Sequence, residues 1–132
     1  MKYLLDTCTV SDFVKGTPQV LERIRDAEPT SLAISVVTRM EIDYGLALNA
    51  GRARKYLPLL NDFFSVVPTL NIELADAAAS ASLRASLRLK GRPIGAYDVL
   101  IAGTALARGL TVVTSNIGEF GRITGLSVEN WR

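Results

Sequence analysis

Three acidic residues stand where their side chains could work together in a chemical reaction. Asp6 and Glu41 each follow a short apolar run, and Asp98 precedes a stretch rich in alanine and leucine. The chain of 132 residues contains no histidine and a single cysteine, Cys8. This composition excludes Ser-His-Asp and Cys-His mechanisms and nearly all zinc sites. If the protein is an enzyme, carboxylates are therefore the expected catalysts.

A group of carboxylates in one small site requires a neutralising cation, because like charges raise one another's pKa. Mg²⁺ suits such a site, since it takes oxygen ligands and keeps several waters, and Mn²⁺ accepts similar ligands. A metal of this kind can activate water and neutralise charge on a phosphodiester without any histidine. Asn116 and Glu119 follow a later apolar run, and their spacing of three would place them on one face of a helical turn. They are the candidates for a fourth position in the site.

Each acidic residue also has a purely structural interpretation. Asp6 could be a turn or cap residue, and Glu41 and Asp98 could complement the positive ends of helices. The placement of all three at strand-to-helix junctions favours the functional interpretation. Cys8 has no basic partner in view and is interpreted as a small packed side chain rather than a nucleophile.

The elements that would position these residues alternate between strand and helix along the chain. Short apolar runs predict strands, and apolar residues at helical spacing predict helices, with Pro58 expected to kink or divide one of them. This alternation predicts an α/β fold in one domain, residues 1–132, with a central parallel sheet of four to five strands flanked by helices. The predicted strands are 3–5, 32–37, 66–68, 110–114 and 126–128, and the predicted helices are 18–28, 38–48, 52–64, 71–90 and 98–108.

The charge balance permits a polyanionic partner without requiring one. Fifteen basic residues face thirteen acidic ones, so acidic residues gathered in one cleft would leave the remaining surface more basic than the net charge of +2 suggests. Arg84, Arg88, Lys90 and Arg92 could form a phosphate-facing strip or a solvated helix face. One cysteine and no run long enough to span a membrane predict a cytoplasmic protein without a disulfide.

The sequence resembles the PIN-domain ribonucleases, and specifically the VapC toxins of type II toxin–antitoxin pairs. The similarity covers nearly the whole chain, and the order and spacing of its motifs are specific. The motifs are Tyr3-Leu4-Leu5-Asp6-Thr7, Met40-Glu41-Ile42 with Tyr44-Gly45, Gly91-Arg92-Pro93-Ile94-Gly95 leading to Asp98 and Ile101-Ala102, and Val113-Thr114-Ser115-Asn116 with Glu119-Phe120, Leu126 and Trp131.

This resemblance implies that Asp6, Glu41 and Asp98 are the active-site acids of a PIN-like ribonuclease domain. Asp6 and Asp98 would be the direct Mg²⁺ ligands. The resemblance also implies a homodimer, a cognate VapB-type antitoxin that occludes the site, and RNA as the substrate, which is a transfer RNA in some relatives.

Two departures from the family pattern leave other functions open. Cys8 stands where many relatives have asparagine, and Asn116 stands where many PIN domains carry a fourth acid, unless Glu119 supplies that carboxylate. A catalytically weak module that binds nucleic acid or a partner protein is therefore the alternative. A phosphatase with an aspartyl nucleophile is remote, because such enzymes usually carry a second acid two residues later, where Cys8 stands.

Overall fold

A five-stranded, fully parallel sheet forms the centre of the molecule, which is described here as a computed structural model of residues 1–132. The predicted α/β fold with a parallel sheet is confirmed. The strand order is β3-β2-β1-β4-β5, so the first strand lies in the middle of the sheet. The strands are β1 (Tyr3–Leu5), β2 (Leu32–Ser35), β3 (Thr69–Leu70), β4 (Thr111–Val113) and β5 (Val128–Glu129).

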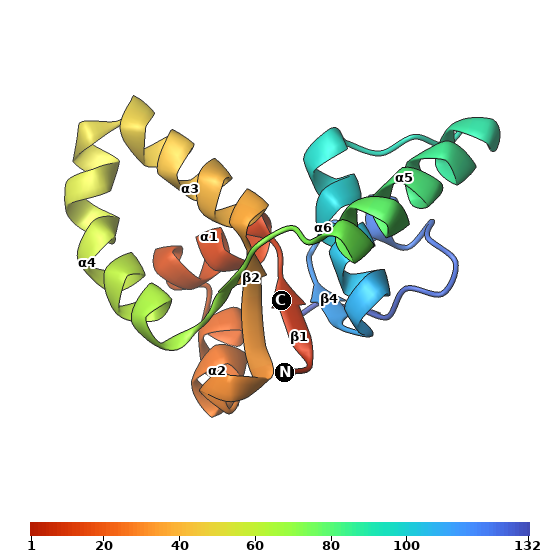
Figure 1. Cartoon of the computed structure of the whole chain (residues 1–132). Helices are drawn as coiled ribbons and strands as arrows, with labels where there is room; N and C mark the ends of the chain where they lie inside the picture. Colours follow the sequence, from red (N-terminus) through yellow and green to blue (C-terminus); the bar gives the residue numbers. More distant parts are fainter.

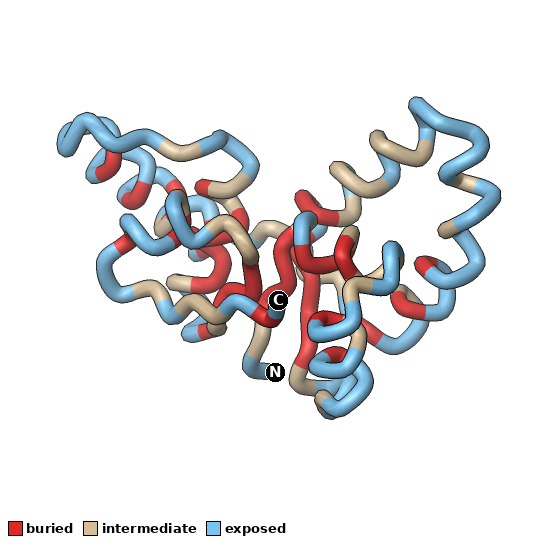
Figure 2. The backbone as a smooth tube through the Cα atoms, turned by 180° about the vertical axis from the view of Figure 1, so that it is seen from behind, coloured by how far each residue is buried: buried red, intermediate tan, exposed pale blue.

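Helices cover both faces of this sheet, as Figure 1 shows, with α1 to α4 on one side and α5 and α6 on the other. Each layer has its own apolar core, one around Leu5, Ile34 and Phe63 and the other around Leu4, Ile101 and Phe120. Figure 2 shows buried backbone concentrated along the sheet, while the outer turns of the helices are exposed. The helices are α1 (Thr7–Lys15), α2 (Pro18–Asp26), α3 (Val36–Leu48), α4 (Ala50–Val66), α5 (Leu74–Leu89), α6 (Ala96–Arg108) and α7 (Ile117–Phe120), with a 3₁₀ turn at Pro29–Ser31.

The junction between β2 and α3 differs from its prediction. The strand ends at Ser35, whose hydroxyl accepts a hydrogen bond of 3.0 Å from the backbone N–H of Val37 and so caps the helix. Residues 36 and 37, predicted as strand, therefore begin α3. Glu41, which a helix beginning at residue 38 would have placed in the first turn, consequently lies in the second turn.

Other boundaries moved because helix capping and tertiary packing outweigh local propensity. Pro58 neither ends nor divides α4, which continues to Val66, so the third strand forms at 69–70 instead of 66–68. The side chain of Asp76 accepts a 2.8 Å hydrogen bond from the backbone N–H of Glu73, and α5 starts at Leu74 rather than beside Asn71.

The C-terminal half of the chain follows its predictions more closely. The helix predicted to end at residue 108 does end there, and Gly109 caps it in the left-handed conformation, with φ of 66°. The last strand pairs at 128–129 rather than 126–128. No helix in the protein is both long enough and apolar enough to cross a membrane.

Candidate active site

The strand order brings Asp6 to the point in the sheet where ligands are expected. β1 lies between β2 and β4, and the chain winds away from β1 in one direction before returning to form β4 on its other side. Open parallel sheets bind ligands at such a switch point, beyond the carboxyl ends of the strands. Asp6 follows β1 there, and its backbone N–H donates a 3.1 Å hydrogen bond to the carbonyl of Val113 at the end of β4.

Asp6 is a buried carboxylate with no cationic partner. Its side chain is only 2% exposed, and no lysine or arginine forms an ion pair with it. Its Oδ1 accepts a 2.9 Å hydrogen bond from the backbone N–H of Thr9 and so caps α1. Burial raises the pKa of Asp6, and hydrogen bonds from Thr114 and Thr9 offset part of that rise. The structural cap interpretation of Asp6 is therefore correct, but it does not account for a buried carboxyl group without a cationic partner.

Asp98 lies in the first turn of α6 and is partly buried. Burial, followed by the neighbouring carboxyl groups of Glu119, Asp6 and Glu41, raises the pKa of Asp98 to about 7. Charges influence one another this strongly only at short range in a poorly solvated site. The structure thus brings the acids at positions 6, 41, 98 and 119 into one electrostatic neighbourhood, which we call the acidic centre.

Glu41 reaches the acidic centre from α3 and is fixed by a contact with α1. The hydroxyl of Thr7 donates a 2.7 Å hydrogen bond to Glu41 Oε1. Thr7 directly follows Asp6, so this bond ties two strand-to-helix junctions together. Sequence reasoning missed Thr7, although its place in the opening Asp-Thr pair was a usable signal. Both residues line a cavity of about 210 Å³ that also reaches Lys15 and Arg52.

The fourth corner of the site is formed by Asn116 and Glu119. The amide Nδ2 of Asn116 donates a 3.0 Å hydrogen bond to Glu119 Oε2, which confirms that the spacing of three places both side chains together. The backbone N–H of Asn116 is itself held by a 2.9 Å bond to the Thr114 hydroxyl. Of the two residues, Glu119 is the one that affects Asp98 directly.

Cys8 is exposed, so its prediction as a small packed side chain is wrong. It lies on α1 two residues beyond Asp6, where the helix faces the acidic centre. Partial burial, then the charges of Asp6 and Asp98, raise the pKa of the thiol to about 11. The group is therefore a neutral thiol near pH 7, in agreement with the expectation that it is not a nucleophile.

The donor set of the acidic centre fits a hard divalent cation that keeps much of its water. Carboxylates crowded enough to raise the pKa of Asp98 to about 7 gain from a cation that replaces the retained proton. No three Asp, Glu or Cys side chains converge tightly enough to hold one ion by themselves. A site with one or two protein carboxylates and several waters is the coordination that Mg²⁺ usually adopts.

Comparison with known proteins identifies the family to which this chain belongs. Residues 3–126 match the model of the PIN domain. The chain is 36% identical over 131 residues to the tRNA(fMet)-specific endonuclease VapC of Salmonella typhimurium, with 99% of this chain and 98% of the relative covered.

Two solved structures are also closely similar. The DNA-bound VapBC complex of Salmonella typhimurium contains a chain that superimposes with a TM-score of 0.91 at 37% identity, covering 100% of this chain and 99% of that one. VapBC2 of Rickettsia felis, bound to a promoter DNA fragment, gives a TM-score of 0.89 at 30% identity, with both chains fully covered.

Proposed function

Because this chain belongs to the PIN-domain family, and within it to the VapC ribonucleases, we propose that it is a metal-dependent endoribonuclease and the toxin of a type II toxin–antitoxin pair. The observation that carries this proposal is the acidic centre itself. Two carboxylates, Asp6 and Asp98, lie at the switch point of a parallel sheet without a basic partner and with raised pKa values. Carboxyl groups held in this way destabilise the folded protein, and strongly perturbed pKa values of this kind are typical of a functional site.

Asp6 and Asp98 are the proposed ligands of Mg²⁺ or Mn²⁺. When bound, the ion would activate a water and neutralise charge on the scissile phosphate. Asp6 is suited to this role because its bond to the N–H of Thr9 fixes the carboxylate in one orientation. Glu41 has a catalytic place in this proposal, and its hydrogen bond from Thr7 holds the carboxylate at the edge of the site. Glu119 is the better of the two candidates for the fourth position, since Asn116 brings no charge.

The proposed substrate is RNA, and a transfer RNA is a specific candidate because the Salmonella typhimurium relative is named for cleavage of tRNA(fMet). The proposed partner is a VapB-type antitoxin, since the similar structures are VapBC complexes. We further propose that the toxin is a homodimer and acts in the cytoplasm.

A cleavage assay tests the activity directly. Purified protein free of antitoxin should cut RNA in the presence of Mg²⁺ or Mn²⁺ and should stop when EDTA is added. Asp98→Asn should be inactive, because the amide keeps the size of the side chain but cannot supply the charge. Asp26→Asn is the matched control, since Asp26 is exposed on α2 and makes no ion pair.

Equal cleavage by wild type and Asp98→Asn would refute the assignment of the site. RNA binding without cleavage by any of these proteins would instead support the alternative of a binding module. A growth experiment addresses the toxin role: expression of wild type should arrest growth, co-expression of the cognate antitoxin should relieve the arrest, and Asp98→Asn should be harmless. Harmless expression of an active wild-type enzyme would contradict that role.

A further inference from the structure

The end of α5 and the loop after it carry a run of basic residues that the acidic centre does not use. No Asp or Glu stands anywhere between Asp76 and Asp98, although this stretch contains four cations. All four side chains are exposed. We call this set the α5 strip, and its members are Arg84, Arg88, Lys90 and Arg92.

None of the four cations in the α5 strip is neutralised by an acid of the protein. The ion pairs of the molecule engage arginines at positions 23, 39, 108 and 132 instead. Clustered like charges repel one another, and neither burial nor an ion pair compensates that repulsion here. A polyanion bound across the strip would neutralise these charges and remove their repulsion.

The α5 strip lies beside the start of the helix that carries Asp98. Arg84 and Arg88 line a cavity of about 280 Å³ together with Ala96 and Val99 of α6. Val99 is the residue next to Asp98, so this cavity adjoins the first turn of the catalytic helix. The strip therefore lies next to the N-terminal turn of α6, the same turn that carries Asp98.

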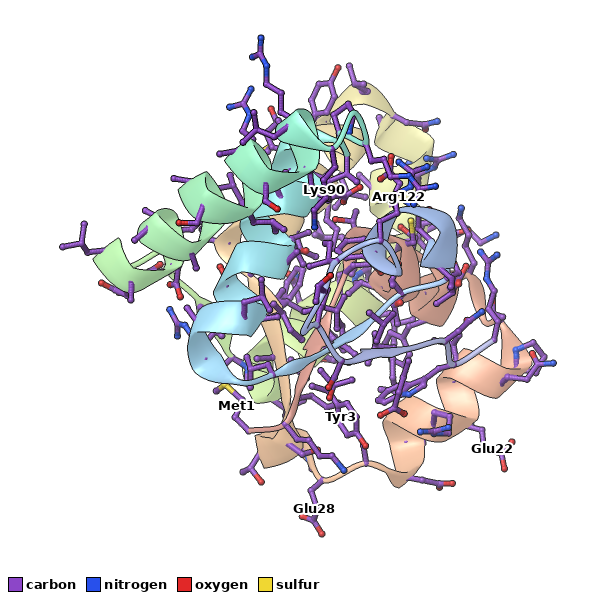
Figure 3. The ribbon with its side chains drawn as sticks, turned by 90° about the vertical axis from the view of Figure 1, so that its right-hand side faces the viewer. Met1, Tyr3, Glu22, Glu28, Lys90 and Arg122 are labelled. Carbon is purple, nitrogen blue, oxygen red and sulfur yellow. The ribbon has the colours of Figure 1, made fainter.

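A further cation joins the strip from the segment after α7. Arg122 donates a 3.3 Å hydrogen bond to the carbonyl of Pro93, and Lys90 and Arg122 line one cavity of about 350 Å³. Figure 3 shows Lys90 and Arg122 near each other at one end of the molecule, with Met1 and Glu28 at the opposite end. These two basic residues thus lie toward the end of the sheet where the strands finish.

We infer that the α5 strip binds the phosphates of an RNA strand that flank the scissile bond. This inference rests on the proposed function and adds the surface that would hold the substrate. Arg84 and Arg88 are one helical turn apart, about 6 Å along the axis, so both can contact one flexible single strand. Such contacts position the nucleic acid without reading its sequence, and their strength depends on salt.

The test is a binding measurement in EDTA, where no cleavage takes place. A fluorescently labelled single-stranded RNA is titrated with wild type and with the double variant Arg84→Gln/Arg88→Gln at several salt concentrations. The matched control is Lys2→Gln/Arg25→Gln, which removes the same charge from unpaired cations at the opposite end of the sheet. Melting curves of all three proteins establish that each one is folded.

We expect the strip variant to weaken binding about tenfold and to reduce the slope of log Kd against log salt by about 1.4, which corresponds to two phosphate contacts on a single strand. The control should change Kd less than about twofold. In cleavage assays with Mg²⁺, the strip variant should raise KM more than it lowers kcat.

The outcomes separate the two proposals. Wild type that binds RNA through the strip but never cuts it would refute the nuclease and leave the strip supported. If wild type is active but the strip variant and the control lose equal affinity for RNA, the assignment of RNA binding to the α5 strip would be overturned. Unchanged RNA binding by the strip variant, with weaker capture of the antitoxin, would reassign this surface to the protein partner and overturn the inference.

Discussion

Asp76 and Asp6 are two almost completely buried aspartates, with exposed fractions of 1% and 2%, yet they have opposite electrostatic surroundings. Asp76 forms a two-pronged ion pair with Arg108, at 2.6 Å to Nη2 and 3.1 Å to Nε, and also accepts the N–H of Glu73. These partners hold the pKa of Asp76 below its ordinary value. Asp6 has no cation beside it, and burial raises its pKa.

Asp76 is thus a carboxylate that stabilises the fold, whereas the burial of Asp6 without a cation lowers the stability of the folded protein. The Asp76–Arg108 pair joins the start of α5 to the end of α6, and so helps to fix the helix that carries Asp98. The acidic centre lies at the other end of α6 and lacks any arginine or lysine in an ion pair. A bound cation is the partner that would complete it.

Removal of the charge of Asp6 should have the largest effect, and on activity alone. Asp6→Asn should lower kcat/KM for RNA about a thousandfold, equivalent to about 4 kcal/mol of lost transition-state stabilisation by the metal. The amide oxygen can still accept the N–H of Thr9, so the cap of α1 and the fold should survive. Chemical denaturation of both proteins in EDTA should show that the variant is at least as stable as wild type. A variant that loses stability in proportion to activity would mean that Asp6 is mainly structural.

Asp76→Ala should give the reverse result. It leaves Arg108, whose side chain is only 29% exposed, without its acid and removes the cap at Glu73. We expect a loss of about 3 kcal/mol in the free energy of unfolding, measured with urea. Activity per folded molecule should change little. Asp43→Ala is the control, because its ion pair with Arg39 is exposed and should contribute less than about 0.5 kcal/mol.

The acidic centre could be predicted from the sequence because its members follow strands or open helices. Parallel strands end at one edge of the sheet, so Asp6 and the segment after β4 had to meet once the fold class was correct. Asn116 and Glu119 were paired by spacing alone, and their hydrogen bond forms.

Residues whose placement depends on contacts between distant segments could not be predicted in this way. Arg108 and Asp76 are 32 positions apart, and no periodicity links them. The bond from Thr7 to Glu41 spans 34 positions and depends on how α1 and α3 cross. The start of α3 was misplaced because Val36 and Val37 favour a strand, while the hydroxyl of Ser35 caps a helix.

The pH dependence of the Asp98 carboxyl should separate its chemical role from its cost in stability. Its pKa of about 7 means that the folded protein retains a proton that must leave before a cation binds. Cleavage with Mg²⁺ should therefore rise between pH 6 and pH 8, and the midpoint should move to lower pH as Mg²⁺ is increased.

The raised pKa of Asp98 also determines how the stability of the protein changes with pH. Because its folded pKa lies above the ordinary value of 3.8, the unfolded state releases the proton at lower pH, and stability falls as pH rises toward 7. Relative to wild type, Asp98→Asn should thus gain about 1 kcal/mol between pH 5 and pH 8 in EDTA, after allowance for solvent screening at this partly exposed group. A stability difference that is the same at both pH values would contradict the raised pKa.

Glu119→Gln should lower activity much less than Asp6→Asn or Asp98→Asn, and it should show what Glu119 contributes to the acidic centre. After burial, Glu119 is the main cause of the raised pKa of Asp98, whereas Gln keeps the length of the side chain and can still accept the Asn116 amide. The acid limb of the pH–activity profile should therefore move to lower pH by about one unit or less.

If Glu119 also helps to hold the cation, the Mg²⁺ concentration for half-maximal activity should rise about tenfold in Glu119→Gln. We expect both effects, and we expect Asn116→Asp in the Glu119→Gln background to restore Mg²⁺ affinity by returning a charge to the corner. A shifted profile with unchanged Mg²⁺ dependence would limit Glu119 to tuning Asp98, and the acidic centre would then bind its cation through Asp6 and Asp98 alone.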